Sequence, residues 1–309
     1  MSKPLCIAVD WGTSNLRVYL IDHDGKVMAE QASDQGMLSL AQGDFEPVLS
    51  DLIQPWLHHQ VPVLMAGMVG SRSGWQEVPY LECPLGLDGL ATQLHQLDTA
   101  LPIAVYIVPG VKGVGAAGQV DVMRGEETQL LGLWGAHSDS DGPMTFCLPG
   151  THCKWGQLDQ SRLEGFSTVM TGELFALLCQ HSSLAKGQAD SASQFDQDWF
   201  DAGVILAEEQ GGLMHQLFTV RSRTVTGELP ASGLASYLSG ILIGTDVLAN
   251  LDLCDNRHLY LIGSDTVSAR YQRVLSRFAV DVSQLTAKDA SVQGFVALAR
   301  SAQAQGVTL

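Results

Sequence analysis

The chain has 309 residues, of which 46% are hydrophobic and 16% charged, a composition that excludes wholesale disorder and allows two domains of about 150 residues each. Its 33 acidic residues outnumber 17 Lys and Arg, giving a net charge of −16, which argues against a nucleic-acid partner because such a surface needs a basic stripe. Any anion-binding site must therefore be built from a few local cations.

Cysteine usage and the N-terminal segment predict a cytoplasmic protein. The cysteines, at positions 6, 83, 147, 153, 179 and 254, form neither a CxxC pair nor a zinc-binding spacing, as expected for reduced and mostly buried thiols. Lys3 leads directly into a predicted strand, without the apolar segment of a signal peptide. We find no apolar run of about 18 residues, so we expect no membrane span.

The first predicted element is a β-hairpin over residues 7–21 whose turn could bind phosphate. An apolar run ends in Asp10, and the polar turn Gly12-Thr13-Ser14-Asn15 leads into a second apolar run. Such a turn can wrap phosphate oxygens with hydroxyls and backbone N–H groups, while a carboxylate holds Mg²⁺ through water. A surface hairpin with a polar turn is a common structure and stays an open alternative.

The pattern then alternates between strands and helices. Three short strands are predicted over 4–31, followed by a helix over 42–58 that Pro55 could end early, buried strands over 61–66 and 101–108, a glycine-rich loop over 110–118 and a helix over 121–134.

Residues 113–118, GVGAAG, satisfy the GxGxxG pattern of dinucleotide-binding proteins. That motif should start at the end of a strand and open a helix, whereas residues 109–112 and 119–121 separate these glycines from both neighbouring elements. A dehydrogenase is therefore a weak alternative, and we interpret the segment as a flexible loop between domains. The chain has no P-loop pattern.

The strand–turn–strand pattern recurs at residues 144–158. An apolar strand over 144–148 precedes the turn Gly150-Thr151-His152, and Lys154 begins a second, less regular strand. Two halves that each contain a phosphate-type hairpin suggest a duplicated architecture with a cleft between them. Later segments predict helices over 172–181, 195–210, 232–251, 265–277 and 288–303, and a strand over 258–262.

Several cations could neutralise charge during phosphoryl transfer, which depends mainly on positioning and electrostatics. Arg17 follows the first turn and Lys154 the second, although an exposed strand lysine is an equally weighted alternative for Lys154. Arg72 follows a buried strand in the segment MAGMVGSRSGW. Its guanidinium suits a carboxylate or vicinal oxygens, and an ion pair with Glu77 is nearly as well supported.

Three carboxylates lie within about two helical turns in the segment DVMRGEETQLLG, residues 121–132. Glu126 or Asp121 could accept a proton from a substrate hydroxyl, and Arg124 lies among them. An ordinary helix N-terminus, where carboxylates favour the dipole, is the alternative. Further along, Gly263-Ser264 joins a strand to a helix, a junction that can pack against a nucleotide base and ribose.

Together these segments resemble the 2-dehydro-3-deoxygalactonokinase family, sugar-acid kinases of the superfamily that includes acetate kinase, actin and the heat-shock ATPases. The resemblance spans nearly the whole chain and rests on the order and spacing of DWGTSNLR (10–17), MAGMVGSRSGW (65–75), VPGV (108–111), DVMRGEETQLLG (121–132), LPGTHCKW (148–155), MTGELFALL (170–178) and LSGILIG (238–244).

The resemblance implies an α/β fold of two ribonuclease-H-like domains, at residues 1–118 and 119–309, with ATP in the cleft between them. It also implies a reaction in galactonate degradation. ATP would phosphorylate the 6-hydroxyl of 2-dehydro-3-deoxy-D-galactonate, giving 2-dehydro-3-deoxy-6-phospho-D-galactonate and ADP. The expected small molecules are the sugar acid, ATP and Mg²⁺.

Roles for individual residues follow from the same resemblance. Glu126 occupies the place of the catalytic Asp of glycerol-type kinases, with Asp121 in reserve, and Arg17 assists catalysis. Asp10 is the expected ligand of the metal ion. Arg72 matches a substrate-contacting Arg, so the expected substrate residues are Gly70, Ser71, Arg72, Trp75 and Arg124. The expected nucleotide residues are Gly12, Thr13, Ser14, Asn15, Gly150, Thr151, His152, Lys154, Gly263 and Ser264.

Other functions stay open at this point. One is a kinase for another small sugar acid or polyol, since Arg72 suits several oxygen-rich substrates. Another is a non-catalytic ATP-dependent sensor on the same fold, which would bind ATP without substrate-stimulated ADP release. No nucleic-acid or membrane partner is expected, and the oligomeric state is left open, with a homodimer as one option.

Overall fold

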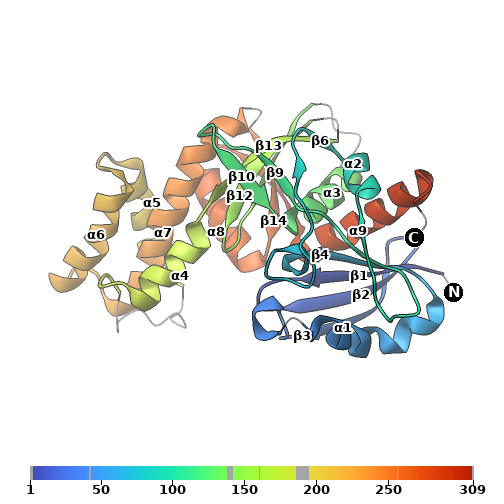
Figure 1. Ribbon diagram of the computed structural model, residues 1–309. Coiled ribbons are helices and arrows are strands. Elements are labelled where there is room, and N and C mark those ends of the chain that lie inside the picture. Colours follow the sequence, from blue (N-terminus) through green and yellow to red (C-terminus); the bar gives the residue numbers. More distant parts are fainter. Residues whose placement is uncertain are drawn as a thin grey trace. The chain divides into compact units, whose positions relative to one another are not determined.

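The computed structural model describes residues 3–41, 43–137, 142–159, 161–185, 195–255 and 257–307 (Figure 1). The chain divides into two compact units. Unit 1 comprises residues 1–144, 157–167 and 285–309, and unit 2 comprises residues 145–156 and 168–284. Mixed α/β structure is found in both.

The six-stranded sheet of unit 1 carries the predicted first hairpin. Its order is β3-β2-β1-β4-β8-β7, with β1 at Pro4–Trp11, β2 at Leu16–Asp22, β3 at Val27–Ser33, β4 at Val63–Gly67, β7 at His95–Leu97 and β8 at Val105–Ile107. The first three strands pair antiparallel in sequence order, whereas β1, β4 and β8 are parallel. The predicted strands over 4–31, 61–66 and 101–108 are thus present.

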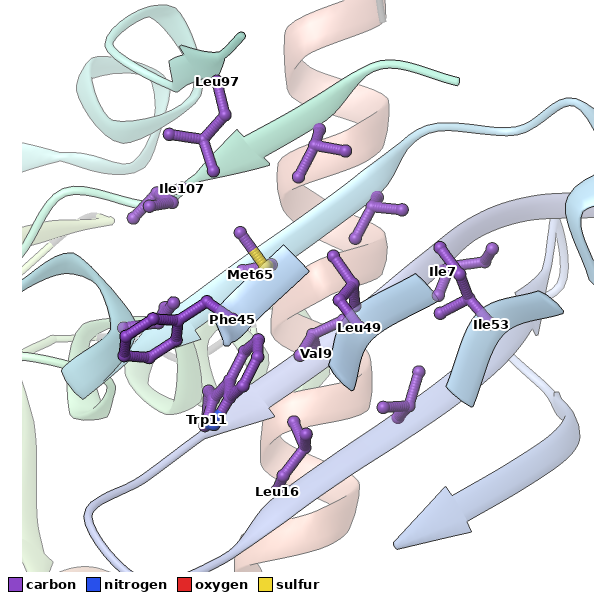
Figure 2. Close-up of a cluster of buried hydrophobic side chains, with 14 of the residues drawn as sticks. Ile7, Val9, Trp11, Leu16, Phe45, Leu49, Ile53, Met65, Leu97 and Ile107 are labelled. Carbon is purple, nitrogen blue, oxygen red and sulfur yellow. The ribbon is translucent and has the colours of Figure 1, made fainter. Parts of the chain in front are cut away.

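The main core of unit 1 lies between this sheet and α1, Phe45–Ile53. Alternate residues of β1 point toward α1, and every fourth residue of α1 points back toward the sheet. Figure 2 shows the resulting cluster of Ile7, Val9, Trp11, Phe45, Leu49 and Ile53. Each fully buried side chain of this size contributes roughly 1.5–3 kcal/mol. Pro55 ends α1 as expected, and a 3-10 helix continues over Gln54–His59.

Helix α9, Ala287–Ala304, covers the opposite face of the same sheet (Figure 2). It also packs along α3, Glu126–Ala136. The short helix α2, Leu87–Thr92, contacts α9 as well. A C-terminal segment therefore completes the unit that the N-terminal strands begin.

The glycine-rich segment forms a β-hairpin, which corrects the interpretation as a flexible loop between domains. Strand β9, Val111–Val114, pairs antiparallel with β10, Val120–Met123, and β5, Leu81–Glu82, completes a three-stranded sheet. Gly115 N donates to Gln119 O at 2.9 Å across the turn. The glycines therefore lie in and beside a β-turn. Because residues 120–123 are extended, the predicted helix over 121–134 begins only at Glu126.

The third sheet has the order β15-β14-β11-β12-β13-β6. The strands are β6 at Leu85–Gly86, β11 at Met144–Leu148, β12 at Cys153–Asp159, β13 at Arg162–Val169, β14 at His258–Gly263 and β15 at Asp281–Thr286. The predicted second hairpin, over 144–158, is thus formed by β11 and β12. Strands β13 and β15 were not predicted.

The helices of unit 2 are α4 at Thr171–His181, α5 at Gln197–Glu208, α6 at Gly212–Val225, α7 at Ala231–Asn250 and α8 at Asp265–Ser276 (Figure 1). All but α6 match predicted helices. The segment 231–254 is long and apolar enough to span a membrane, contrary to our sequence-based expectation, but 72% of its apolar window is buried within the structure, as in the core helix of a soluble protein.

The compact units differ from the division at residue 118 that the resemblance implies. Residues 119–144, 157–167 and 285–309 lie in unit 1, because β10 pairs with β9 and α3 packs on α9. The free cysteines agree with the expected reduced thiols: Cys83 is partly buried and the other five are buried.

Candidate functional site

The first turn connects β1 and β2 at the end of the hairpin. Asp10 lies opposite Arg17, Trp11 lies opposite Leu16, and Gly12 N donates to Asn15 O at 2.9 Å. The side chains of Thr13, Ser14 and Asn15 are exposed. The turn is therefore closed by one backbone hydrogen bond and presents its polar groups outward, as an anion-binding turn requires.

A second loop braces this turn from behind. Met37 N donates to Gly12 O and Leu38 N donates to Thr13 O, each at 3.0 Å. Gly36 has no room for a side chain, because a Cβ atom there would lie 2.3 Å from the backbone carbon of Ser14. The sequence analysis missed Gly36, since nothing near residue 36 marks a partner for a turn more than twenty residues earlier.

Asp10 and Glu126 form a pair of interacting carboxylates beside the first turn. Burial raises the pKa of the Asp10 carboxyl above its usual range, Arg17 opposes this shift, and the charge of Glu126 adds to it. Glu126 is placed by the start of α3, where its Oε2 accepts a hydrogen bond from Arg124 N at 3.1 Å. The structure thus places the predicted base near the predicted metal-side carboxylate.

The approach of α3 to the sheet depends on two glycines. Gly125 precedes α3 with φ of 109°, and a Cβ atom there would lie 3.2 Å from the Cα of Gly67, at the end of β4. Because β4 is the parallel neighbour of β1, with Ala66 opposite Asp10, this contact brings the N-terminus of α3 to the end of the strand that carries Asp10.

Asp121, the reserve base, lies on the β9–β10 hairpin instead of α3. It pairs with Gly113, and its Oδ1 accepts a hydrogen bond from Val122 N at 2.8 Å. The groups that shift the pKa of Asp10 electrostatically are Arg17 and Glu126. Of the two candidate bases, Glu126 is therefore the one whose charge acts on Asp10.

Glu127 is a buried carboxyl that the sequence analysis left without a role. It is 2% exposed and accepts a hydrogen bond from Gly125 N at 2.6 Å. Burial, with a smaller contribution from Glu126, raises the pKa of Glu127 to about 8. Its place at the first turn of α3 indicates that it fixes the backbone that presents Glu126.

Arg124 and Gly70, two of the predicted substrate residues, are in close contact in unit 1. The Arg124 side chain is 8% exposed, its Nη2 donates to Val78 O at 2.6 Å, and its guanidinium lies 4.3 Å from the ring centroid of Tyr80. A Cβ atom at Gly70 would lie 2.8 Å from Arg124 Nη1. Within the described part of the chain, Nε and Nη1 of Arg124 lack hydrogen-bond partners.

The remaining substrate candidates have different surroundings. Arg72 is exposed, and no ion pair between Arg72 and Glu77 is present among the described residues. Ser71 is buried, with its hydroxyl 3.5 Å from the sulfur of Met37. The Trp75 ring stacks on Phe45 at 6.2 Å. Trp75 is thus anchored in the core and supports the segment that presents Arg72.

The second turn, in unit 2, is held by the first turn of α4. Glu173 N donates to Thr151 O at 2.9 Å, and the His152 ring contacts the Glu173 carboxylate at 2.6 Å. Position 172 has room only for glycine, because a Cβ atom there would lie 2.3 Å from Gly150 O. Lys154 is 4% exposed, which excludes the interpretation as an exposed strand lysine.

A pocket of about 270 Å³ lies beside the second turn. It is lined by the turn and by α4, α7 and α8, through Gly150, Thr151, Thr171, Gly172, Phe175, Ser239, Leu242, Ile243, Val267, Arg270 and Tyr271. The Arg270 guanidinium lies 5.0 Å from the ring centroid of Phe195, and burial lowers its pKa. The pocket combines apolar walls with a cation near a polar turn, a lining that suits a nucleoside.

The predicted adenosine junction lies next to the same turn. Gly263 ends β14, and a Cβ atom there would lie 3.5 Å from Pro149 O. Ser264 occupies the N-cap position of α8, without a side-chain capping hydrogen bond, and α8 also contributes Arg270 to the pocket. The structure therefore brings Gly263 to the turn at Gly150, within unit 2. The sequence analysis did not identify Arg270, Ser239 or Phe175, because isolated residues in helices carry no motif.

Comparison with known proteins gives consistent matches over nearly the whole chain. The family model described as 2-keto-3-deoxy-galactonokinase matches residues 10–298. The 2-dehydro-3-deoxygalactonokinase of Escherichia coli (strain K12) is 35% identical over 296 residues, which cover 96% of this chain and 97% of the relative. The Rhizobium meliloti (strain 1021) protein named "Probable 2-dehydro-3-deoxygalactonokinase DgoK1" is 36% identical, covering 95% and 96%.

Solved structures agree with these matches. A Sinorhizobium meliloti protein, solved as a candidate 2-dehydro-3-deoxygalactonokinase, superposes with a TM-score of 0.84 and 33% identity over 96% of each chain. The activator of 2-hydroxyisocaproyl-CoA dehydratase from Clostridium difficile shares the fold, at a TM-score of 0.50 and 10% identity over 100% of this chain and 98% of the activator. By sequence and by structure, the chain belongs to the 2-keto-3-deoxy-galactonokinase family.

Proposed function

We propose that the chain transfers the γ-phosphoryl group of ATP to the 6-hydroxyl of 2-dehydro-3-deoxy-D-galactonate, as a sugar-acid kinase of galactonate degradation. Its family and its 35–36% identical relatives support this reaction. The observation in the structure that supports the proposal is the close approach of Gly125, which precedes Glu126, to Gly67, which lies beside the end of the strand that carries Asp10. One carboxylate can serve a metal ion while the other accepts a proton.

Glu126 is the proposed general base, which draws the proton from the 6-hydroxyl as its oxygen attacks phosphorus. Arg17 neutralises charge on the transferring group, because it lies across the hairpin from Asp10. Arg72 and the donors of Arg124 bind the carboxylate and other oxygens of the sugar acid. Gly70 leaves space next to Arg124, and Ser71 and Trp75 hold the segment that carries Arg72.

The residues around Asp10 fit a divalent cation. Asp10 is desolvated and lies in the field of a second carboxylate, so a cation would relieve both costs. Asp10 would hold Mg²⁺ through water, and the ion would offset charge on the phosphate oxygens when bound. Among the described residues no cluster of three or more His, Cys, Asp or Glu side chains that could hold a metal ion occurs.

The nucleotide residues are proposed in both units. In unit 1, residues 12–15 form the first phosphate turn. In unit 2, Gly150 and Thr151 form the second, His152 and Lys154 support it, and the pocket beside it takes the nucleoside together with Gly263-Ser264. One phosphate turn in each unit supports the expectation of two ribonuclease-H-like domains with the nucleotide in the cleft between them. The cytoplasmic location and the absence of nucleic-acid and membrane partners stay predictions.

A coupled ADP-release assay tests the proposal. Purified protein with Mg-ATP is offered 2-dehydro-3-deoxygalactonate, 2-dehydro-3-deoxygluconate or glycerol in parallel reactions. We expect selective turnover of the galactonate derivative. Equal turnover of the gluconate derivative would indicate a broader sugar-acid kinase, and turnover of glycerol a polyol kinase. Tight ATP binding without turnover of any of them would overturn the proposal in favour of a nucleotide-dependent sensor.

A further inference from the structure

Asp246, near the C-terminal end of α7, is a buried carboxylate that accepts hydrogen bonds from three other elements of unit 2. Its side chain is 2% exposed. It accepts from Trp155 Nε1 on β12 at 2.8 Å, from Thr171 Oγ1 at the start of α4 at 2.6 Å and from the Tyr271 hydroxyl on α8 at 2.5 Å. The sequence segments and turns described above assign no role to Asp246.

The donors around Asp246 need an acceptor at this position. An indole N–H can only donate, and burying a carboxylate is costly unless hydrogen bonds satisfy it. Burial raises the pKa of Asp246, whereas the hydrogen bonds from Thr171, Tyr271 and Trp155 lower it. Because well-packed apolar side chains often stabilise a core as well as a buried charge does, fold stability alone does not explain the carboxylate.

The hydrogen bond to Thr171 connects Asp246 to the second phosphate turn. Thr171 is the first residue of α4, and the next two residues contact the turn directly. Gly172 leaves no space for a side chain against Gly150 O, and Glu173 N donates to Thr151 O. A shift of Thr171 would therefore be transmitted to the Gly150–Thr151 backbone, which lines the pocket together with Thr171 and Tyr271.

We propose that Asp246 is a positioning residue for nucleotide binding, which holds the Gly150–Thr151 turn in its binding geometry through the hydroxyl of Thr171. Asp246 itself touches no nucleotide atom in this proposal. The inference rests on the proposed function in that it takes the ligand of this turn to be ATP. It predicts that the Asp246–Thr171 hydrogen bond affects affinity for ATP and leaves affinity for the sugar acid unchanged.

The test measures Mg-ATP binding by titration calorimetry, without sugar acid, at a temperature well below every variant's Tm. Thr171→Val replaces the hydroxyl by a methyl group of similar size, and Thr171→Ser retains the hydroxyl. We expect roughly tenfold weaker Mg-ATP binding in Thr171→Val and in Asp246→Asn, the scale of a lost hydrogen bond to a charged group. Thr171→Ser should bind as the unmodified protein does, and the KM for the sugar acid should stay within about twofold.

A matched control comes from the neighbouring residue of α7. Among the described residues, the hydroxyl of Thr245 bonds within its own helix, to Ile241 O at 2.8 Å. Thr245→Val therefore makes the same chemical change without touching the turn and should bind Mg-ATP normally. Unchanged binding in Thr171→Val, or equal losses in Thr171→Val and Thr171→Ser, would overturn the inference. Failure of the unmodified protein to phosphorylate the sugar acid while it still binds Mg-ATP would overturn the proposed function alone.

Discussion

The hairpins at residues 4–22 and 144–159 share a strand–turn–strand pattern, but their turns have different surroundings. The first turn lies beside two carboxylates, Asp10 and Glu126, whose charges interact. The second is braced by α4 and borders a pocket with mainly apolar walls. Similar hairpins therefore have different local chemistry: the first turn lies near interacting charges in unit 1, and the second borders a mainly apolar pocket in unit 2.

The largest expected effect tests whether the chemistry belongs to the first hairpin. Glu126→Gln removes the proposed base while keeping its size, so we expect kcat to fall by roughly 10²–10⁴, the usual contribution of general base catalysis. Steady-state kinetics with saturating sugar acid measures this loss.

Asp121→Asn is the matched control, since Asp121 lies in the same segment but on β10. It should retain kcat within about threefold, as expected for a carboxylate that does not contact the reacting atoms. The opposite result, normal turnover in Glu126→Gln and loss in Asp121→Asn, would transfer the role of base to Asp121.

A smaller effect on kinetics is expected from adding a methyl group behind either of the two turns. Gly36→Ala would press on the first turn and Gly172→Ala on the second, because both added Cβ atoms would lie 2.3 Å from backbone atoms. Such overpacking costs about 1–3 kcal/mol, so the KM for ATP should rise by roughly tenfold or more in each variant.

The comparison between the hairpins sharpens this test. If the first turn serves the chemistry, Gly36→Ala should also lower kcat, whereas Gly172→Ala should act mainly on KM. Gly43→Ala is the control, since a Cβ atom there would meet nothing within 4 Å. Identical changes in kcat and KM in the Gly36 and Gly172 variants would contradict the proposal that the two hairpins have different roles.

The smallest effect on turnover is expected from Glu127, which should act on stability. Because its pKa is raised to about 8 in the folded protein, the folded state retains a proton that the unfolded chain has released between about pH 4.5 and pH 8. Stability should therefore fall as pH rises through this window, by at most roughly 1.4 kcal/mol per pH unit.

Glu127→Gln should flatten this pH dependence, with urea unfolding at pH 5, 6.5 and 8 as the measurement. The exposed Glu209→Gln is the control and should leave the slope unchanged. A slope in Glu127→Gln equal to that of the unmodified protein would show that another group causes the pH dependence.

Periodicity and turn chemistry predicted most of the fold. The hairpin at Asp10, the buried strand before Arg72 and the long helices α7 and α9 were all recognised from apolar spacing, because these elements bury regular faces. The prediction was wrong at residues 110–123, where the glycines suggested a flexible loop and the structure has a β-hairpin. There the alternating valines of β9 and β10 form a sheet that only β5, distant in sequence, completes.

Candidate site residues could be named from the sequence where residues adjacent in the chain form one turn. The turns at Gly12 and Gly150 are such local motifs. Long-range partners were not predictable: Gly36 behind the first turn, Arg270 in the pocket and Asp246 beneath Thr171 all act through contacts that arise only in the folded chain. Motif searches therefore identify the groups that meet a ligand more readily than those that hold them in place.

The order of segments in unit 1 has a consequence for synthesis of the protein. The chain leaves this unit after residue 144, returns at 157–167 and again at 285–309, and its last helix, α9, covers the face of the sheet that β1 and β2 begin. A ribosome releases those strands long before it releases α9. The face of the N-terminal sheet that α9 covers must therefore wait until residues 287–304 have been translated, a period in which binding by a chaperone would prevent aggregation.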